Sequence, residues 1–278
     1  MHTHAHGRSY LPGLLATAVI AACWTSPSFG DAPCMELGEC RVLIEINASD
    51  GDIGFHVLFD AEGWQRAKIF GADGKLLFLE QARKGLKHQK LTENFFESSE
   101  PVCEAGLAEE AGDEVVTLPE FLARFPTGFY EFHLKLDSGG VLAGMTLLSH
   151  SIPAAPADVD FDGSTITWSY GDDLGECVTQ PDGFMLTGEG DIVAYEVVLE
   201  PDDDTFAPFT YSVRVPAGVN SVSVPAGYLS ALPADVPLKV EVGAIERRPN
   251  GSFGNQTFSE EDGFCNNPDQ DECPEEDD

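Results

Sequence analysis

Hydrophobic and polar residues alternate along much of the chain, beginning with a predicted opening strand, RVLIEIN, at residues 41–47. A period of two is typical of β-strands that keep one face in a core. The alternation is clearest in residues 53–61, where the predicted inward side chains are Ile53, Phe55, Val57 and Phe59. Residues 40–150 are therefore predicted to form a β-sandwich-like domain.

Two hairpins are predicted in this first domain. Residues 64–80 contain the pair Asp73-Gly74, which tolerates the positive φ of a tight turn between two strands. Residues 128–136 and 141–150 alternate in the same way on either side of the sequence Asp-Ser-Gly-Gly. Residues 64–80 are therefore predicted to form one hairpin, and residues 128–136 and 141–150 to form the other.

One short helix is predicted between these hairpins. Thr117 is placed to cap it, Glu120 stands at the capping-box position, and Pro119 fits the first turn because its missing amide is not needed there. Pro126 disfavours helical geometry at the residue before it, so the helix is expected to end near Phe125.

Residues 151–158 read SIPAAPAD and are predicted to be an extended hinge between two domains. Pro153 and Pro156 have a fixed φ and no amide to donate, which suits a connection better than a central strand. The second domain is then predicted over residues 159–262, followed by an acidic tail at residues 263–278.

The pattern of the second domain resembles that of a fibronectin type III domain over about a hundred residues. Trp168 matches the core tryptophan of strand B, and Tyr195 and Val197 match the apolar pair of strand C. The pattern of strand F is matched by Leu232, Leu238, Val240, Val242 and Ala244. The resemblance implies a seven-stranded sandwich and no particular activity, because this fold serves many functions. The sequence departs from the family at Leu238, where a tyrosine usually secures the corner before strand F.

The acidic stretch DVDFDG at residues 158–163 begins like a calcium loop, with Asp158, Asp160 and Asp162 at alternate positions. An EF-hand loop also needs a closing glutamate at its twelfth position, which here is Ser169. The residues that follow alternate like a strand and not like a helix. A turn into a strand is therefore the favoured interpretation, a weak calcium site is the alternative, and no metal ligand or cofactor is predicted.

The formal net charge of −33 narrows the classes of partner. So acidic a surface repels nucleic acid and anionic headgroups at long range. The expected partner is therefore a protein or a glycan that the sequence does not identify, and contact with a membrane is expected only through a lipid anchor. A basic segment at residues 82–90 is the local exception. Binding of an anionic glycan or an acidic partner is one interpretation, and the favoured one is a solvated turn or a partner of the protein's own carboxylates.

Residues 1–30 are predicted to be a signal peptide. The apolar run at residues 11–22 is too short to span a bilayer but has the length of a signal-peptide core. It ends at Cys23 in a sequence that resembles the bacterial lipoprotein box, which implies acylation of that cysteine; cleavage after Gly30 is the alternative. Either route removes His2, His4 and His6 and places the protein in the cell envelope or outside the cell.

Removal of Cys23 leaves six cysteines, an even number that suits disulfides in an oxidising compartment. Six cysteines allow fifteen pairings. Proximity in the sequence favours Cys34 with Cys40 and Cys265 with Cys273, which leaves Cys103 with Cys177.

No catalytic signature is present, and no catalytic residue is predicted. His56, His88, His133 and His150 stand in no known metal or nucleophile motif. The function predicted is a binding or structural role at the envelope or cell surface, without catalysis. The alternative is a glycan-active enzyme or a carbohydrate-binding accessory module in the first domain, where a cleft with convergent Asp, Glu or His would favour the enzyme. The aromatic residues that such a site would use, although core packing is the favoured interpretation, are Trp64, Phe95, Phe96 and Phe121.

Overall fold

The computed structural model describes residues 34–108, 114–202, 209–233, 236–249 and 251–266. The predicted signal peptide, Cys23, Cys273 and most of the acidic tail lie outside these residues, so those assignments stay predictions. Among the described residues, no helix is long and apolar enough to cross a membrane.

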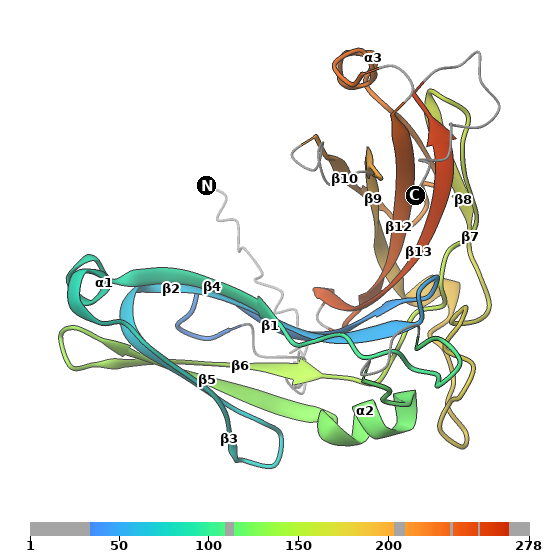
Figure 1. Ribbon diagram of the computed structural model, residues 1–278. Helices are drawn as coiled ribbons and strands as arrows, with labels where there is room; N and C mark the ends of the chain where they lie inside the picture. Colours follow the sequence, from blue (N-terminus) through green and yellow to red (C-terminus); the bar gives the residue numbers. More distant parts are fainter. Residues whose placement is uncertain (1–33, 109–113, 203–208, 234–235, 250, 267–278) are drawn as a thin grey trace, which may run out of the picture. The chain divides into compact units, whose positions relative to one another are not determined.

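The first segment, which comprises the described residues up to 150, is built mainly of strands, as its alternation predicts (Figure 1). A long central strand, β2 (Asp52–Phe70), pairs with β1 and β4 through its first half and with β3 and β5 through its second half. The other elements are β1 (Glu39–Asn47), β3 (Leu76–Gln81), α1 (Lys84–Gln89), β4 (Leu91–Glu97), α2 (Leu118–Arg124), β5 (Gly128–Leu136) and β6 (Val141–Leu148).

The predicted inward face of β2 forms the centre of the first core. Its four predicted side chains are at most 2% exposed, and they pack with Trp64, Tyr130 and the apolar residues of α2. Both predicted hairpins are present, as β2–β3 and β5–β6. Helix α2 ends at Arg124, near the predicted residue, although the side chain of Thr117 makes no capping hydrogen bond. The short helix α1 was not predicted, and none of its residues is buried.

Among the described residues, the second segment, which runs from residue 151 to residue 266, contains seven strands, the number that the resemblance implies. They are β7 (Ala157–Phe161), β8 (Thr165–Ser169), β9 (Ile192–Pro201), β10 (Tyr211–Pro216), β11 (Ser221–Ser223), β12 (Pro237–Arg247) and β13 (Phe253–Cys265), with the short helices η1 (Glu189–Asp191) and α3 (Ala226–Leu229). Strands β11, β8 and β7 form one sheet, and β10, β9, β12 and β13 belong to the other. Trp168 is 3% exposed in the core of this segment, with its ring 5.4 Å from that of Tyr195. The predicted mostly β fold is confirmed.

The tyrosine that the second segment lacks at Leu238 has a structural counterpart nearby. The hydroxyl of Tyr228 in α3 donates to the carbonyl of Leu199 at 2.8 Å and can also reach the carbonyl of Phe209 at 2.6 Å. Leu238 itself is fully buried. A polar clasp is therefore supplied by a different element, and the position before strand F is left to apolar packing.

The two segments share one continuous sheet, which the sequence does not reveal. Strand β1 pairs in parallel with β13, so Glu45 lies beside Gln256 and Asn47 beside Phe258. This pairing joins the sheet of the first segment to β13, β12, β9 and β10 of the second (Figure 1). How the chain divides into independently folding domains stays a prediction.

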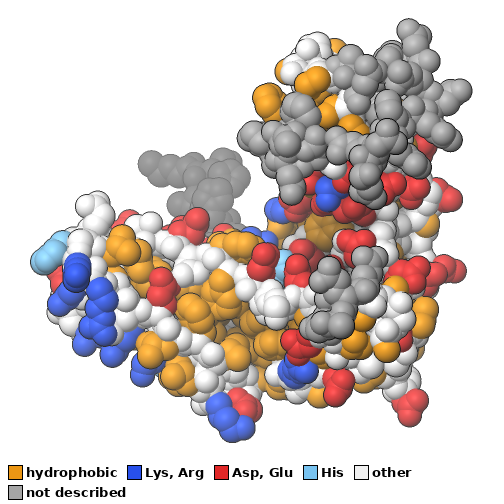
Figure 2. All heavy atoms as spheres, viewed as in Figure 1, with side chains coloured by type: hydrophobic (Ala, Val, Ile, Leu, Met, Phe, Trp, Pro, Cys, Tyr) orange, Lys and Arg blue, Asp and Glu red, His pale blue; other side chains and the backbone are white. Residues whose placement is uncertain are grey.

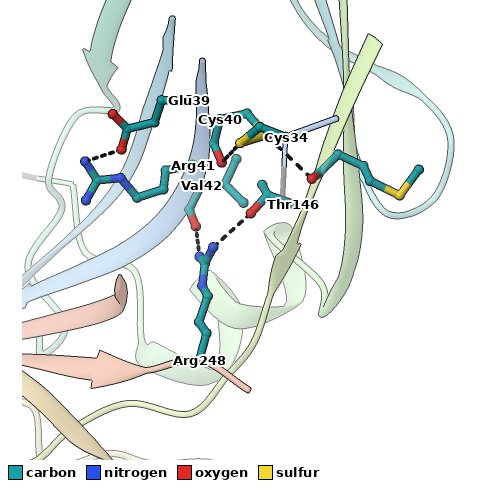
Figure 3. Close-up of a disulfide and its surroundings, with 8 residues drawn as sticks. Cys34, Glu39, Cys40, Arg41, Val42, Thr146 and Arg248 are labelled. Carbon is teal, nitrogen blue, oxygen red and sulfur yellow. Dashed lines mark hydrogen bonds and ion pairs between the residues drawn. A yellow bond between two sulfur atoms is a disulfide. The ribbon is translucent and has the colours of Figure 1, made fainter. Parts of the chain in front are cut away.

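Buried polar contacts reinforce this junction. Arg248 donates to the carbonyl of Val42 and, at 2.8 Å, to the hydroxyl of Thr146 (Figure 3). Asn255 accepts a hydrogen bond from the backbone amide of Ile44 at 2.9 Å. The predicted hinge lies against β13, where the hydroxyl of Thr257 donates to the carbonyl of Pro153 at 2.8 Å.

Two of the three suggested disulfides are present. Cys34 is bonded to Cys40, next to the start of β1 (Figure 3), and Cys103 is bonded to Cys177. Cys265 lies at the end of β13, and its suggested partner Cys273 is outside the described residues, so that pairing stays a prediction.

Candidate functional site

The acidic groove is a depression of about 360 Å³ on the face of the shared sheet that points away from the first core. Its walls come from β4, β2 and β1 on one side and from β13, β12, β9 and β10 on the other. The carboxylates that line it are Glu45, Glu97, Glu196 and Glu241, together with the cations Arg41 and Arg214. An adjoining recess of about 140 Å³ adds Asp52, Glu100 and Glu260.

Strand register explains why these side chains meet. Glu45 is opposite Gly54 in the β1–β2 pair, and His56 is two residues further along β2 on the same face. Glu100 follows β4 in a segment fixed to β2 by two backbone hydrogen bonds, from Ser98 to the carbonyl of Phe55 at 3.0 Å and from Ile53 to the carbonyl of Pro101 at 3.1 Å. Ordinary strand pairing therefore brings three ligand-type side chains to one point.

Glu45, His56 and Glu100 form the cluster at this point. The Nε2 atom of His56 lies 3.4 Å from an Oε1 oxygen of Glu100 and 3.8 Å from that of Glu45. One ligand-type atom from each of the three residues lies within 4.8 Å of the other two. The His56 side chain is only 8% exposed, compared with 24% for Glu45 and 38% for Glu100.

Gly54 provides the space for this cluster. A Cβ atom at Gly54 would stand 2.6 Å from Oε1 of Glu100 and 2.7 Å from Nε2 of His56. Both distances are too short for non-bonded heavy atoms, so any other residue at this position would displace one of the two side chains. The glycine opposite Glu45 is thus part of the site.

The electrostatics of the cluster reflect its burial. Burial raises the pKa of Glu45 to about 7, and the nearby Glu100 adds to the rise while His56 opposes it. Burial works to lower the pKa of His56, but the hydrogen bond to Glu100 and the charge of Glu45 raise it above its ordinary value. In the recess, burial and the charge of Glu100 raise the pKa of Asp52 to about 7. The ionised forms of Glu45 and Asp52 are therefore unfavourable unless a proton or another cation neutralises them.

One lysine compensates the far wall of the recess. The Nζ atom of Lys239 lies 3.2 Å from Glu241, 3.2 Å from Glu260 and 3.7 Å from Glu200. No ion pair within 4.0 Å joins Lys239 to Glu45 or Glu100 in the described structure. Lys239 therefore neutralises carboxylates of β9, β12 and β13. The positive charge nearest to Glu45 and Glu100 is the one that His56 carries when it is protonated.

The arrangement can bind positive charge or transfer a proton. Carboxylates and a histidine in one depression are ligands for metal ions and acceptors for ammonium or guanidinium groups. A carboxyl with a pKa near 7 is also suited to general acid–base work near neutral pH.

The sequence-predicted candidates are placed elsewhere, with two exceptions. His56 and Phe95 contribute to the groove, and Phe95 is 59% exposed at its edge instead of packed in a core. Trp64 and Phe121 are buried, as expected, and Phe96 stacks on Phe78 with ring centroids 4.3 Å apart. Of the other histidines, His133 forms an exposed pair with Glu131 at 3.5 Å.

The basic segment at residues 82–90 is solvated. In the described structure its Lys and Arg side chains form no ion pair within 4.0 Å, and all of its residues except Ala82 are exposed. Figure 2 shows Lys and Arg side chains gathered at the end of the molecule that carries α1, and Asp and Glu side chains gathered on the side of β12 and β13. The segment is a short helix with solvated charges and not a turn.

The acidic stretch at residues 158–163 is a turn only in part: Asp158 and Asp160 belong to strand β7, and the chain turns at residues 162–164. One carboxylate oxygen of Asp162 accepts hydrogen bonds from the backbone amides of Ser164 at 2.9 Å and Thr165 at 2.7 Å. Asp158 accepts a hydrogen bond from the hydroxyl of Ser169 at 2.7 Å. Asp162 is therefore used by the turn itself and Asp158 by the β7–β8 pair, and strand β8 follows the turn directly.

Sequence reasoning missed Glu45, Glu100 and Gly54. Glu45 appeared only as part of the predicted strand at residues 41–47, and His56 lay on the outward side of residues 53–61, a side that is usually solvated. A weak signal was present there, because Gly54 and His56 are neighbours on that side of the strand.

No family model matches the chain, and no curated protein matches it either. Among solved structures, chicken CNTN1 FN1–FN3 domains align at 12% identity over 85% of this chain and 68% of that one, with a TM-score of 0.26. A bacterial ice-binding adhesin aligns at 16% identity over 80% and 62%, with a TM-score of 0.21. Fibronectin(III)-like modules of Clostridium thermocellum CbhA align at 8% identity over 79% and 92%, with a TM-score of 0.19. Similarities this low carry no argument about the activity of this chain.

Proposed function

We propose that this protein is exported and acts at the cell envelope or surface as a binding protein without a catalytic role. The predicted signal sequence, with its lipoprotein-type box at Cys23, supports export. The disulfides Cys34–Cys40 and Cys103–Cys177 support it independently, because such bonds persist in oxidising compartments. In this proposal a lipid on Cys23 anchors the protein to the envelope.

The acidic groove is the observation that carries the binding role. Its carboxylates outnumber its cations, and the chain as a whole has a formal net charge of −33. Such a depression attracts positive ligands and speeds their association. We assign to it a basic segment of a partner protein, since arginine side chains form strong paired hydrogen bonds with carboxylates.

The test is the binding of a fluorescent hexa-arginine peptide to the purified full chain in the presence of chelator. The variant Glu97→Gln/Glu196→Gln should weaken binding at least about tenfold, which is about 1.4 kcal/mol. The control Glu189→Gln/Asp191→Asn removes the same charge from exposed positions outside the groove and should change the affinity less than about twofold. Equal losses in both variants would show general attraction to an acidic surface and refute the groove.

The anchor is tested separately in a bacterial host. The wild-type chain should take up labelled fatty acid and enter the detergent phase, and Cys23→Ser should abolish both. A soluble wild-type product that begins at Asp31 would refute the lipid anchor and favour plain secretion.

A second candidate function, acid–base chemistry on a glycan, is favoured by the convergence of His56 with two carboxylates. The Glu45 and Glu100 oxygens lie within 4.8 Å of each other, which is close to the roughly 5–5.5 Å between carboxyl groups of retaining glycosidases. Phe95 offers an exposed ring at the groove edge for stacking on a sugar. The test is the release of reducing ends from a panel of polysaccharides, with Glu45→Gln and Glu100→Gln as variants. Release that both variants retain would refute this role.

A further inference from the structure

The cluster of Glu45, His56 and Glu100 has the dimensions of a metal-binding site. Around an ion bound at about 2.0–2.1 Å, neighbouring ligands of a tetrahedron are about 3.3 Å apart, and those of wider geometries are further apart. The two distances from His56 Nε2 to the carboxylate oxygens are 3.4 and 3.8 Å. The three atoms can therefore surround one ion after small side-chain movements.

Strand β13 carries a candidate fourth ligand, Gln256. Gln256 is the register neighbour of Glu45 and lines the same groove as Glu45 and His56. Gln256 is only 8% exposed, and in the described structure its Oε1 oxygen is buried without a hydrogen-bond partner. A buried amide oxygen without a partner is unfavourable, because it has lost the hydrogen bonds that it makes in water. A bound cation would satisfy this oxygen, which an ionised carboxylate cannot do because it is itself an acceptor.

The surrounding structure fixes three of the four ligands before any ion arrives. The three strands that carry Glu45, His56 and Gln256 are hydrogen-bonded neighbours in one sheet. Gly54 keeps the space between His56 and Glu100 clear. Sites on rigid strands hold their ligands more accurately than sites on loops.

We infer that Glu45, His56, Glu100 and Gln256 bind one divalent ion of the first transition series, such as Zn²⁺ or Mn²⁺. The imidazole nitrogen decides the class of ion, because Ca²⁺ and Mg²⁺ take oxygen ligands while these ions accept mixed nitrogen and oxygen sets. The inference stands on the four ligands and does not depend on the proposed basic partner. This site also differs from the acidic stretch at residues 158–163, whose aspartates offer only oxygen ligands.

The experiment is calorimetric titration of ZnCl₂, MnCl₂ and CaCl₂ into the full chain, purified without an affinity tag. All variants carry His2→Ser, His4→Ser and His6→Ser, so that the N-terminal histidines contribute no site. Zn²⁺ or Mn²⁺ should bind with a stoichiometry of one, and more tightly than Ca²⁺. His56→Gln and Glu100→Gln should each weaken binding at least about tenfold, in the range found for perturbed metal sites. Gln256→Leu should weaken it less, and Gly54→Ala should weaken it by displacing His56 or Glu100.

The matched control is His133→Gln, which removes the histidine of an exposed His–Glu pair and should leave the affinity unchanged. Glu100→Gln also guards against misfolding, because this side chain is 38% exposed and glutamine keeps its size; urea unfolding without metal shows whether the variant is folded. The absence of saturable binding by all three ions would overturn the inference, as would binding that survives both His56→Gln and Glu100→Gln.

The metal site and the proposed function can fail separately. The peptide assay is run in chelator and the metal titration without peptide. Metal binding without peptide binding would refute the basic partner and leave the ion site standing. Peptide binding without metal binding would refute the ion site and leave the basic partner standing.

Discussion

The two faces of the β1–β2 pair are both largely buried, but different parts of the molecule bury them. On the core face, Phe55 and Val57 are covered by apolar side chains of the first segment itself. On the opposite face, His56 is 7% exposed among carboxylates, next to strands of the second segment. Adjacent residues of one strand thus occupy an apolar core and a charged groove. A polar position in an alternating strand can therefore be buried when strands from another part of the chain extend the same sheet.

The sharpest way to break this comparison is to remove neighbouring side chains from the two faces. Phe55→Ala should lower the free energy of unfolding by about 3–5 kcal/mol, because its ring is 2% exposed and stacks on Phe125 with centroids 4.1 Å apart. His56→Gln should cost only about 1–3 kcal/mol, the range for hydrogen bonds to charged groups. Urea unfolding at pH 7 measures both. Equal losses would mean that the polar face is as important to the fold as the core.

The second core extends the comparison to the other segment. Trp168→Ala should lower the free energy of unfolding by about 3–5 kcal/mol, because the indole fills the space between the two sheets. The unfolding transition followed by tyrosine fluorescence gives the value. A loss below about 1 kcal/mol would contradict the assignment of β8 as the central strand of this core.

The disulfide Cys103–Cys177 tests how strongly the chain is held near the recess. The two cysteines are 74 positions apart, and Cys103 donates its backbone amide to the carbonyl of Gly51, just before β2. The double variant Cys103→Ser/Cys177→Ser should lose about 2–5 kcal/mol. Mass mapping of alkylated thiols in the denatured, unreduced protein should find neither cysteine free. Free thiols at both positions would show that this disulfide does not form.

The smallest expected effect concerns the charge on the polar face. The pKa of Glu45 is about 7 in the folded protein, compared with 4.5 for an ordinary glutamate, so the folded state binds the proton more tightly than the unfolded chain. Stability should therefore fall as pH rises from about 4.5 to about 7. The raised pKa of His56 acts in the same direction, since its contribution is complete below its ordinary 6.5 and is lost as pH rises through the folded value.

Glu45→Gln should remove the penalty of the Glu45 charge. Without metal, this variant should be more stable than wild type by roughly 1–3 kcal/mol at pH 8 and nearly equal to it at pH 5. Thermal and urea unfolding at both values of pH measure the difference, with the exposed Glu120→Gln as a control. A variant that is less stable than wild type at pH 8 would show that Glu45 is held by favourable charge contacts and not penalised by burial.

Much of the fold was predictable because it depends on local alternation. The inward residues of β2, the two hairpins and the core position of Trp168 follow from period two and from turn residues such as Gly74. The functional site was not predictable in the same way. Its ligands come from residues 45, 56, 100 and 256, and neither spacing nor motif connects them.

The sequence by itself determined that the chain is mostly β and which apolar side chains of β2 and β8 enter a core. Only the tertiary structure decided that β1 lies parallel to β13, because such a pairing joins strands more than two hundred residues apart and depends on backbone hydrogen bonds that any sequence can form. That pairing brings Gln256 next to Glu45 and turns the polar side of a strand into a buried groove. The chemistry of this protein is therefore set by which strand edges meet, a choice made by the packing of the whole sheet and not by any local pattern.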